Sequence, residues 1–397
     1  MEERLTVVGG GIGGLTCAIA LAQRGFQVRV IEQAEEFEEI GAGIQLGPNL
    51  LRSLASLGLA DHVLADAWVP NSLTVRDALD GEEIDSIPVG SGFRERFGQP
   101  YALTHRADLL NTLLAACRAD ERIELRTSSR VGKITSHPDR VELTLDNGDT
   151  LETPALVGAD GLWSDVRQHV LGDGKPRISG HIAYRAVLAA EDVPEELWSP
   201  DMTAWLGPRT HLVHYPLRRG TLYNLVAVFH SDRYGEGYDE AGDVDELRRH
   251  FANEHESVRA LLDRIDVWRY WVLCDRDPRR GWTKDRVTLL GDAAHPMLQY
   301  LAQGAAMSIE DGVCLAAEFA KADGDPHVAF PRYEDKRVLR TGRTQLMARM
   351  YGEAFHASEV TRELRNEMLR ARTPEESWDS MAWLYDFDPL AAETTAG

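Results

Sequence analysis

A glycine-rich turn between an apolar run and a helical segment constrains this chain more than any other feature of its sequence. Gly9-x-Gly11-x-x-Gly14 follows the apolar run 5–8 and opens the small, apolar segment 13–24. In such a pattern the first glycine permits a tight turn, the second lets backbone approach a pyrophosphate, and the third lets helix and strand pack closely. The pattern predicts a βαβ unit in a parallel sheet, with a dinucleotide at the helix N-terminus.

An acidic residue follows the turn at the spacing that dinucleotide-binding folds use. Glu32 lies 18 residues after Gly14, at the end of a second predicted strand, 27–31. A carboxylate about 20 residues on can bind the ribose hydroxyls of a dinucleotide. The alternative is a glycine-rich turn without a ligand. The chain holds one such fingerprint, so we expect no second, separate nicotinamide-binding domain.

Composition excludes several other classes of protein. Of 397 residues, 43 are Lys or Arg and 64 are Asp or Glu, a net charge of −21 that argues against nucleic-acid and membrane-surface partners. We find no apolar run near the ~18 residues that span a bilayer, and no signal peptide at the N-terminus. The four cysteines are widely spaced, so we expect neither a zinc site nor a disulfide framework, and a cytoplasmic location.

Two further turns carry an aspartate directly after a glycine. Gly158-Ala159-Asp160-Gly161 follows a predicted strand, and Gly291-Asp292-Ala293-Ala294-His295-Pro296 follows the core strand 287–290. Such an aspartate can accept hydrogen bonds from ribose or ribitol hydroxyls, while the next helix N-terminus faces phosphate. Taken singly, each aspartate is more simply a helix cap.

Together and in this order, the three motifs resemble the single-component FAD-dependent aromatic hydroxylases, the group A flavoprotein monooxygenases. The resemblance runs from Leu5 to about Ala320. It implies FAD as cofactor, with NADH (or NADPH) and O₂ as co-substrates, and a homodimer. The cofactor-binding residues that it implies are Gly9, Gly11, Gly14, Glu32, Arg106, Asp160, Gly161, Gly291 and Asp292.

The resemblance also implies an α/β fold, in which a Rossmann-like FAD-binding domain carries an inserted antiparallel β-sheet substrate domain and a helical C-terminal tail. We place the FAD-binding domain at 1–75, 101–176 and 275–330, the substrate domain at 76–100 and 177–274, and the helical region at 331–397. Local patterns predict helices at 48–59, 106–118, 246–265 and 305–320. Asn147-Gly148 predicts a hairpin with a type I′ turn.

Within the family, the stretch PMLQYLAQGAAMSIEDGVCLA (296–316) is more similar to the 3-hydroxybenzoate 6-hydroxylases, which make gentisate, than to salicylate 1-hydroxylases or 6-hydroxynicotinate 3-monooxygenases. The segment 207–220 is similar to their substrate strand. This resemblance nominates His211, Tyr215 and Gln299 as catalytic-site residues, with a hydroxybenzoate as substrate.

The residue types fit that chemistry. Strand alternation puts His211 and Tyr215 on one face and His214 on the other. An imidazole with a pKa near 6.5 can accept a phenol proton, and the phenolate directs electron density to its ortho and para carbons for attack on a flavin hydroperoxide. The 6-position of 3-hydroxybenzoate is para to the hydroxyl. Tyr215, Gln299 or Arg185 could meet the substrate carboxylate, and the sequence leaves that choice open.

Simpler interpretations remain for each of these features. A histidine and a tyrosine on a strand are more often structural residues, and His295 is expected to shape a flavin loop. The charged runs 35–39 and 362–372 read as solvated surface. At the level of the whole protein, the alternatives are a non-catalytic flavin-binding redox sensor and a plain NAD-binding module.

Overall fold

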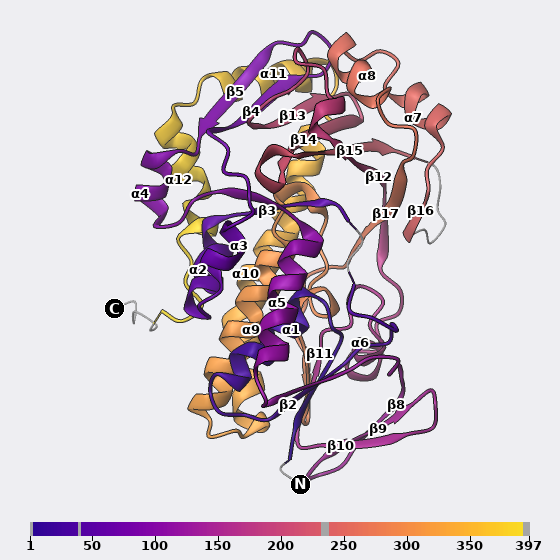
Figure 1. Ribbon diagram of the computed structural model, residues 1–397, viewed down its shortest axis with the longest axis vertical. Coiled ribbons are helices and arrows are strands. Elements are labelled where there is room, and N and C mark those ends of the chain that lie inside the picture. The colour runs from indigo at the N-terminus through magenta and orange to yellow at the C-terminus, as the bar shows by residue number, and fades with distance from the viewer. Residues whose placement is uncertain (1–2, 39–40, 232–237, 392–397) are drawn as a thin grey trace.

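A six-stranded sheet forms around the glycine-rich turn, in the lower half of the molecule in Figure 1. The structure is a computed structural model that describes residues 3–38, 41–231 and 238–391. The strand order is β18 (Thr283–Lys284), β19 (Val287–Leu289), β11 (Leu156–Gly158), β1 (Leu5–Val8), β2 (Val28–Ile31) and β7 (Ile123–Arg126). All neighbours pair in parallel except β18 with β19. The predicted βαβ start is therefore confirmed.

Long helices pack lengthwise beside this sheet, as Figure 1 shows. They are α1 (Ile12–Ala22), α5 (Arg106–Ala119), α9 (Gly304–Lys321) and α10 (Pro326–Phe355). α1 and α9 can approach closely because Gly312 in α9 has no side chain. A Cβ at this position would lie 2.9 Å from the backbone nitrogen of Cys17 in α1. α9 is thereby held against α1, the helix that follows the glycine-rich turn.

An eight-stranded sheet occupies the upper half of the molecule (Figure 1). In order, its strands are β16 (Tyr238–Ala241), β17 (Arg269–Asp275), β12 (Arg177–Ala189), β15 (Leu222–His230), β14 (Thr210–Leu217), β13 (Met202–Gly207), β4 (Ser72–Asp77) and β5 (Glu83–Pro88). All neighbours are antiparallel except β13 and β4, which pair in parallel. The predicted α/β class with an inserted sheet is confirmed. The domain boundaries stay a prediction.

Two short helices cover the outer face of the eight-stranded sheet, α7 (Val244–His250) and α8 (Glu256–Leu262). The prediction of one continuous helix over 246–265 is wrong. The chain breaks because the His255 side chain accepts a hydrogen bond from the backbone of Ser257 and so starts a new helix. Local side-chain capping overrides the helical periodicity here.

Smaller elements complete the fold. The strands are β3 (Gly43–Leu46), paired with β6 (Ala102–His105), and the three-stranded set β8 (Val131–Ser136), β9 (Val141–Leu145) and β10 (Thr150–Thr153). The helices are α2 (Pro48–Ser56), α3 (Ala60–Leu64), α4 (Ser91–Phe97), α6 (Asp165–Val170), α11 (Glu359–Arg370) and α12 (Pro374–Tyr385). The β9–β10 hairpin forms, but its turn is not type I′, because only Gly148 has a positive φ, +87°.

The charged run 362–372 is not simply solvated surface, contrary to expectation. Arg362 in α11 binds Asp77 at 2.7 Å and Asp80 at 2.8 Å, and Asp77 is fully buried. The same carboxylate accepts a hydrogen bond from Asn366. These contacts fasten α11 to the edge of the eight-stranded sheet, so part of the run serves packing.

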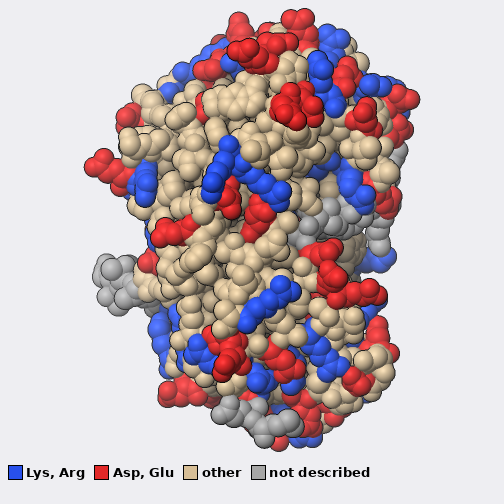
Figure 2. Space-filling model, viewed as in Figure 1, with Lys and Arg blue, Asp and Glu red and all other residues tan. Residues whose placement is uncertain are grey.

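The surface carries charges of both signs despite the net charge of −21. Basic and acidic side chains are interspersed over the face shown in Figure 2. Among the described residues, no helix combines the length and the apolar character needed to cross a membrane.

Candidate functional site

The three glycines of the first motif have different structural roles. A Cβ on Gly9, whose φ is +107°, would lie 2.3 Å from the carbonyl oxygen of Ala159, and one on Gly14 would lie 2.0 Å from that of Gly9. Both positions therefore exclude a side chain. A Cβ on Gly11 meets nothing within 4 Å. Gly11 borders open space at the N-terminus of α1, where unpaired N–H groups can receive a phosphate.

Glu32 at the end of β2 holds the glycine-rich loop in place. Its carboxylate accepts hydrogen bonds from the backbone N–H of Gly10 at 2.7 Å and of Ala34 at 2.9 Å. Each carboxylate oxygen has two acceptor sites, so both can still accept from ribose hydroxyls. The position fits the predicted role and adds a structural one.

The second motif supports the start of a helix, as in the simpler interpretation, although the N-cap residue of α6 is Ser164. Asp160 accepts hydrogen bonds from the Ser164 hydroxyl at 2.5 Å and from the backbone N–H of Val166 at 3.0 Å, at the start of α6. Burial raises the pKa of Asp160 to about 6. Gly161, with φ +77°, has open space where a Cβ would be, so its backbone can be approached by a ligand.

The third motif forms a short turn whose backbone is fixed from two sides. Gly291 has φ +61° and donates its N–H to Asp311 at 3.0 Å. Arg167 donates to the carbonyl oxygens of Ala293 and Ala294 at 2.8 and 2.7 Å. These contacts leave the Asp292 side chain exposed on the turn, as a cofactor-binding residue requires.

His295 lies inside the same turn and is fully buried. Its Nε2 lies 2.5 Å from the Asp311 carboxylate, so its contacts are those of a residue that shapes the loop. Burial alone would raise the pKa of Asp311, but His295 and Arg337 outweigh it and hold that pKa well below its usual range. The loop thus rests on an ionised, buried carboxylate.

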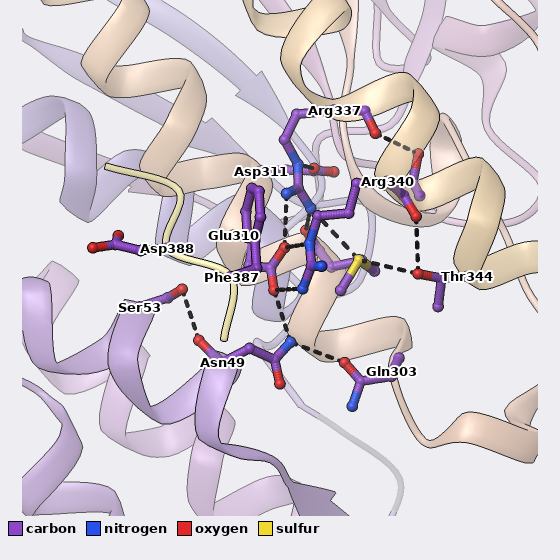
Figure 3. Close-up of polar contacts among 12 residues, drawn as sticks. Asn49, Ser53, Gln303, Glu310, Asp311, Arg337, Arg340, Thr344, Phe387 and Asp388 are labelled. Carbon is purple, nitrogen blue, oxygen red and sulfur yellow. Dashed lines mark hydrogen bonds and ion pairs between the residues drawn. The ribbon is translucent and has the colours of Figure 1, made fainter. Parts of the chain in front are cut away.

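Figure 3 shows the larger network around this carboxylate. The side chains of Glu310, Asp311 and Arg337 are fully buried, and Arg337 binds the two carboxylates at 2.7 and 2.6 Å. Arg340 pairs with Glu310 at 2.7 Å, and Asn49 in α2 donates to Glu310 at 2.7 Å. The network ties α2, α9 and α10 to the flavin-binding loops.

This network was missed in the sequence. The pair Glu310-Asp311 stands in the otherwise apolar stretch 309–317 of α9, which should have marked two buried carboxylates in need of cationic partners. Their partners lie in α10, about 26 residues further on, at a spacing that no sequence pattern specifies.

Arg106 is the first residue of α5 and is half-buried. Its backbone N–H donates to the carbonyl oxygen of Ala42 at 2.9 Å, which joins α5 to the segment leading into β3. The neighbouring strand β3 crosses the inner face of the eight-stranded sheet, where a Cβ on Gly43 would lie 2.5 Å from the Tyr215 ring. Arg106 therefore lies between the two sheets.

Two of the predicted substrate residues, His211 and Tyr215, share the inner face of the eight-stranded sheet. The register sets His211 opposite Val228, Val213 opposite Val226, and Tyr215 opposite Asn224. His211 and Tyr215 are buried, whereas Val213 and Val226 between them are only half-buried. An apolar, partly accessible patch thus separates the imidazole from the phenol.

Arg185 links two of the nominated groups. It donates to the Gln299 side-chain oxygen at 2.7 Å and lies over the Trp271 ring at 5.0 Å. Burial raises the pKa of Tyr215, and the positive charge of Arg185 partly opposes that rise. Gln299 and Tyr215 are therefore both close to one guanidinium, which the sequence suggested as a carboxylate partner.

His211 points into a cluster of aromatic rings instead. Its Nδ1 lies 2.8 Å from Nε2 of His356, and its ring lies 5.3 Å from that of Tyr300. Gln299 and Tyr300 are neighbours in one 3₁₀ turn, so that turn contacts both Arg185 and His211. His356 at the end of α10 was not singled out in the sequence, because nothing local connects it to β14.

His214 lies on the outer face, as the alternation predicts. It accepts a hydrogen bond from Trp205 Nε1 at 2.9 Å, and its Nδ1 lies 2.7 Å from the Tyr223 hydroxyl. Both ring nitrogens have partners within the sheet core, which makes His214 a structural histidine.

The glycine-rich turn, the acidic end of β2 and the two Gly-Asp turns meet at the carboxyl ends of β1, β11 and β19, and the space at Gly11 and Gly161 fits a dinucleotide. A family model described as "FAD binding domain" matches residues 3–340. The chain belongs to this family, which includes the FAD-dependent aromatic hydroxylases, and its cofactor is FAD.

Individual proteins within this class are similar to the chain over nearly its whole length. The chain is 44% identical over 97% of its length to 3-hydroxybenzoate 6-hydroxylase 1 of Aquipseudomonas alcaligenes, covering 98% of that protein. It is 43% identical to the 3-hydroxybenzoate 6-hydroxylase of Klebsiella oxytoca, with 96% of each chain covered. The structure of Klebsiella pneumoniae HpxO with FAD and uric acid matches with a TM-score of 0.84, at 26% identity over 95% of each chain.

Proposed function

We propose that this protein hydroxylates 3-hydroxybenzoate at position 6, giving gentisate, with NADH and O₂ as co-substrates. One observation carries the proposal: the inner sheet face presents a buried imidazole, a half-buried apolar patch and a guanidinium in that order. A hydroxybenzoate has the matching sequence of groups, a phenol, a ring and a carboxylate. The names of the relatives at 43–44% identity support the same substrate.

His211 is the residue that takes the phenol proton in this proposal. Burial, followed by the neighbouring His181 and His230, lowers the pKa of His211 to about 3. The expectation of an ordinary imidazole pKa near 6.5 is therefore wrong. The ring is neutral at working pH and can accept a proton, but it cannot keep one. The phenolate that results is electron-rich at the para carbon, which is position 6.

Arg185 binds the substrate carboxylate in this proposal, with Gln299 and Tyr215 as hydrogen-bonding neighbours. A buried carboxylate needs a charged partner, and a guanidinium supplies two donors in one plane. Val213 and Val226 contact the ring and, with Met297 and Leu301, exclude water from it. A dry site favours hydroxylation over loss of the oxidant to water.

Bound FAD supplies the redox chemistry that carries electrons from NADH to O₂. The residues that would hold it are Gly9, Gly11, Gly14, Glu32, Arg106, Asp160, Gly161, Gly291 and Asp292, assigned here on their positions around the strand ends. Because the chain has one dinucleotide fingerprint, we propose that NADH binds without a separate domain of its own.

The test of this function is a substrate panel. Purified, FAD-loaded enzyme receives NADH, O₂ and one of the isomeric hydroxybenzoates or 6-hydroxynicotinate, and the products are identified by chromatography. Gentisate from 3-hydroxybenzoate is expected. Brisk turnover of salicylate to catechol and CO₂ would replace the proposal with the salicylate reaction, and turnover of 6-hydroxynicotinate with that of its 3-monooxygenase. NADH oxidation that no aromatic acid stimulates would favour a redox sensor.

A residue-level test separates the base from the cofactor site. His211→Ala should lower hydroxylation by about 10²–10⁴-fold, the usual contribution of a general base, while FAD content stays at the wild-type level. His214→Ala on the opposite face is the matched control. Loss of FAD in His211→Ala would show that His211 belongs to the cofactor site instead.

The assembly is a homodimer in this proposal, and the protein acts in the cytoplasm. In the single chain, large apolar side chains are exposed along α10 and α11. They are Leu339, Leu346, Met350, Val360, Leu364 and Met368. A second copy would cover such a surface. Sedimentation analysis should give twice the chain mass, and Leu346→Lys should shift it toward the monomer.

A further inference from the structure

Three histidines form a hydrogen-bonded row that leads away from the inner sheet face. His211 Nδ1 lies 2.8 Å from His356 Nε2, and His356 Nδ1 lies 2.9 Å from His230 Nε2. His356 therefore uses Nε2 toward His211 and Nδ1 toward His230, and the two contacts leave Nε2 of His211 and Nδ1 of His230 at the ends of the row. His211 and His356 are 3% and 7% exposed, whereas His230 is half-buried. The row starts at the proposed base and ends at His230, the one of the three residues that is only half-buried.

We infer that His211, His356 and His230 are a proton relay that carries the phenol proton of the substrate to solvent. The inference rests on the proposed function. The phenol proton binds Nε2 of His211, and the proton on Nδ1 of His211 moves to Nε2 of His356. The Nδ1 proton of His356 moves to Nε2 of His230, which releases its own Nδ1 proton to water.

This sequence balances. One proton leaves the substrate, one reaches water, and all three rings stay neutral with exchanged tautomers. Passage of a proton in the reverse direction, when the product oxygen is protonated again, restores the starting tautomers. No oxidant, metal or further group is needed, and each transfer runs along a hydrogen bond of ordinary length.

The surroundings of the three histidines favour passing a proton on over holding it on one ring. Burial lowers the pKa of His211 to about 3 and that of His230 to about 4, and it lowers that of His356 well below the usual value. The titratable and charged groups that face the row are His181, Tyr300, His250 and the exposed Arg209, and Glu353 acts on Tyr300. A ring with so low a pKa cannot retain a proton at neutral pH, so a proton taken from the phenol has to move on.

A metal ion is the other ligand that such a cluster could take. One ring nitrogen each from His181, His230 and His356 lies within 4.8 Å of the others. Two nitrogens bound tetrahedrally to one zinc at about 2.0 Å stand about 3.3 Å apart, with both lone pairs aimed at the ion. The 2.9 Å contact between His230 and His356 is a hydrogen bond instead, and His181 Nδ1 is engaged by the Tyr300 hydroxyl at 2.5 Å.

The test measures the proton itself. FAD-loaded enzyme is mixed without O₂ with 3-hydroxybenzoate in weak buffer that contains a pH indicator, and proton release and phenolate absorbance are followed by stopped flow. His356→Gln keeps a hydrogen-bonding side chain between its neighbours but cannot pass a proton. We expect proton release to slow at least ten-fold, with binding of FAD retained. The control is His214→Gln, which removes an equally buried, doubly bonded histidine from the outer face and should release the proton at the wild-type rate.

His230→Gln is the second variant, at the half-buried end of the row, and carries the test if His356→Gln does not bind FAD. Millimolar imidazole should restore proton release in His230→Gln, since a small base can take the place of the last ring. Release at the wild-type rate in both variants, or a stoichiometric metal in wild-type enzyme that His356→Gln loses, would overturn the relay while gentisate formation stands. Wild-type enzyme that neither releases a proton nor makes gentisate would overturn the proposed function itself.

Discussion

Replacing Arg337 tests whether the buried ion network holds the flavin-binding loops in place. Arg337→Leu removes the cation that binds Glu310 and Asp311, and the side chains of all three residues are fully buried. Removing one partner of a buried ion pair costs about 3–5 kcal/mol, because the remaining charge is left in a low-dielectric interior. Arg340 still pairs with Glu310, so the group that loses its arginine is Asp311, which keeps only its contacts with His295 and the Gly291 N–H.

The expected size of the effect follows from the chain length. Unfolding entropy of about 2.1 cal/mol/K per residue gives roughly 0.8 kcal/mol/K for 397 residues, so 3–5 kcal/mol lowers Tm by about 4–6 °C. Tm is measured by calorimetry at saturating FAD. Arg343→Leu is the control on the same helix, because the one interaction of that exposed arginine with the described residues is its position over the Trp383 ring, a contact of about 0.5–1 kcal/mol.

A double variant separates charge from packing. In Asp311→Asn combined with Arg337→Leu, the buried negative charge is gone, so the loss should be clearly smaller than the sum of the two single losses. The reasoning is refuted if Arg337→Leu costs no more than Arg343→Leu, or if the double variant shows the full sum.

Three further predictions concern the cofactor loop, the substrate and acid stability. Gly14→Ala should weaken FAD binding at least ten-fold in fluorescence titration, because its Cβ would lie 2.0 Å from the Gly9 carbonyl oxygen. Gly90→Ala is the control and should leave the affinity unchanged, because its Cβ would meet nothing within 4 Å. Equal FAD affinities of the two variants would contradict the packing argument. Arg185→Gln should raise KM for 3-hydroxybenzoate at least ten-fold in steady-state assays while KM for NADH stays unchanged; an unchanged KM for the acid would remove Arg185 from the carboxylate site. Burial lowers the pKa of His211 to about 3 in the folded chain, whereas the unfolded chain protonates this residue below about pH 6.5. The free energy of unfolding should therefore fall by about 1.4 kcal/mol per pH unit from this residue as the pH drops from 6.5 toward 3. Urea unfolding across that range should show a shallower slope in His211→Asn, and an unchanged slope would place the titration elsewhere.

The sequence predicted those parts of the fold that local patterns encode. The glycine motif sets a strand, a turn and a helix within some 30 residues, and its steric reasons are visible at Gly9 and Gly14. Strand alternation correctly separated His211 from His214, because a period of two needs no knowledge of the partner strands. The family resemblance supplied the cofactor and the sheet insertion.

Contacts between distant segments could not be predicted in the same way. The row that His211 enters depends on His356, which lies 145 residues further on. Arg337 reaches Asp311 from a neighbouring helix, and Arg362 turns an apparently solvated run into a contact with Asp77. The low pKa of His211 follows from this burial, so the assumption of an ordinary imidazole failed for the same reason.

The identity of the oxygenated product tests the central claim most directly. FAD-loaded enzyme is given NADH, 3-hydroxybenzoate and ¹⁸O₂, and the product is examined by mass spectrometry and chromatography. We predict gentisate that carries one ¹⁸O atom in its new hydroxyl group and keeps its carboxylate. Product labelled from water, a different dihydroxybenzoate isomer, or NADH consumption without any hydroxylated product would contradict the claim.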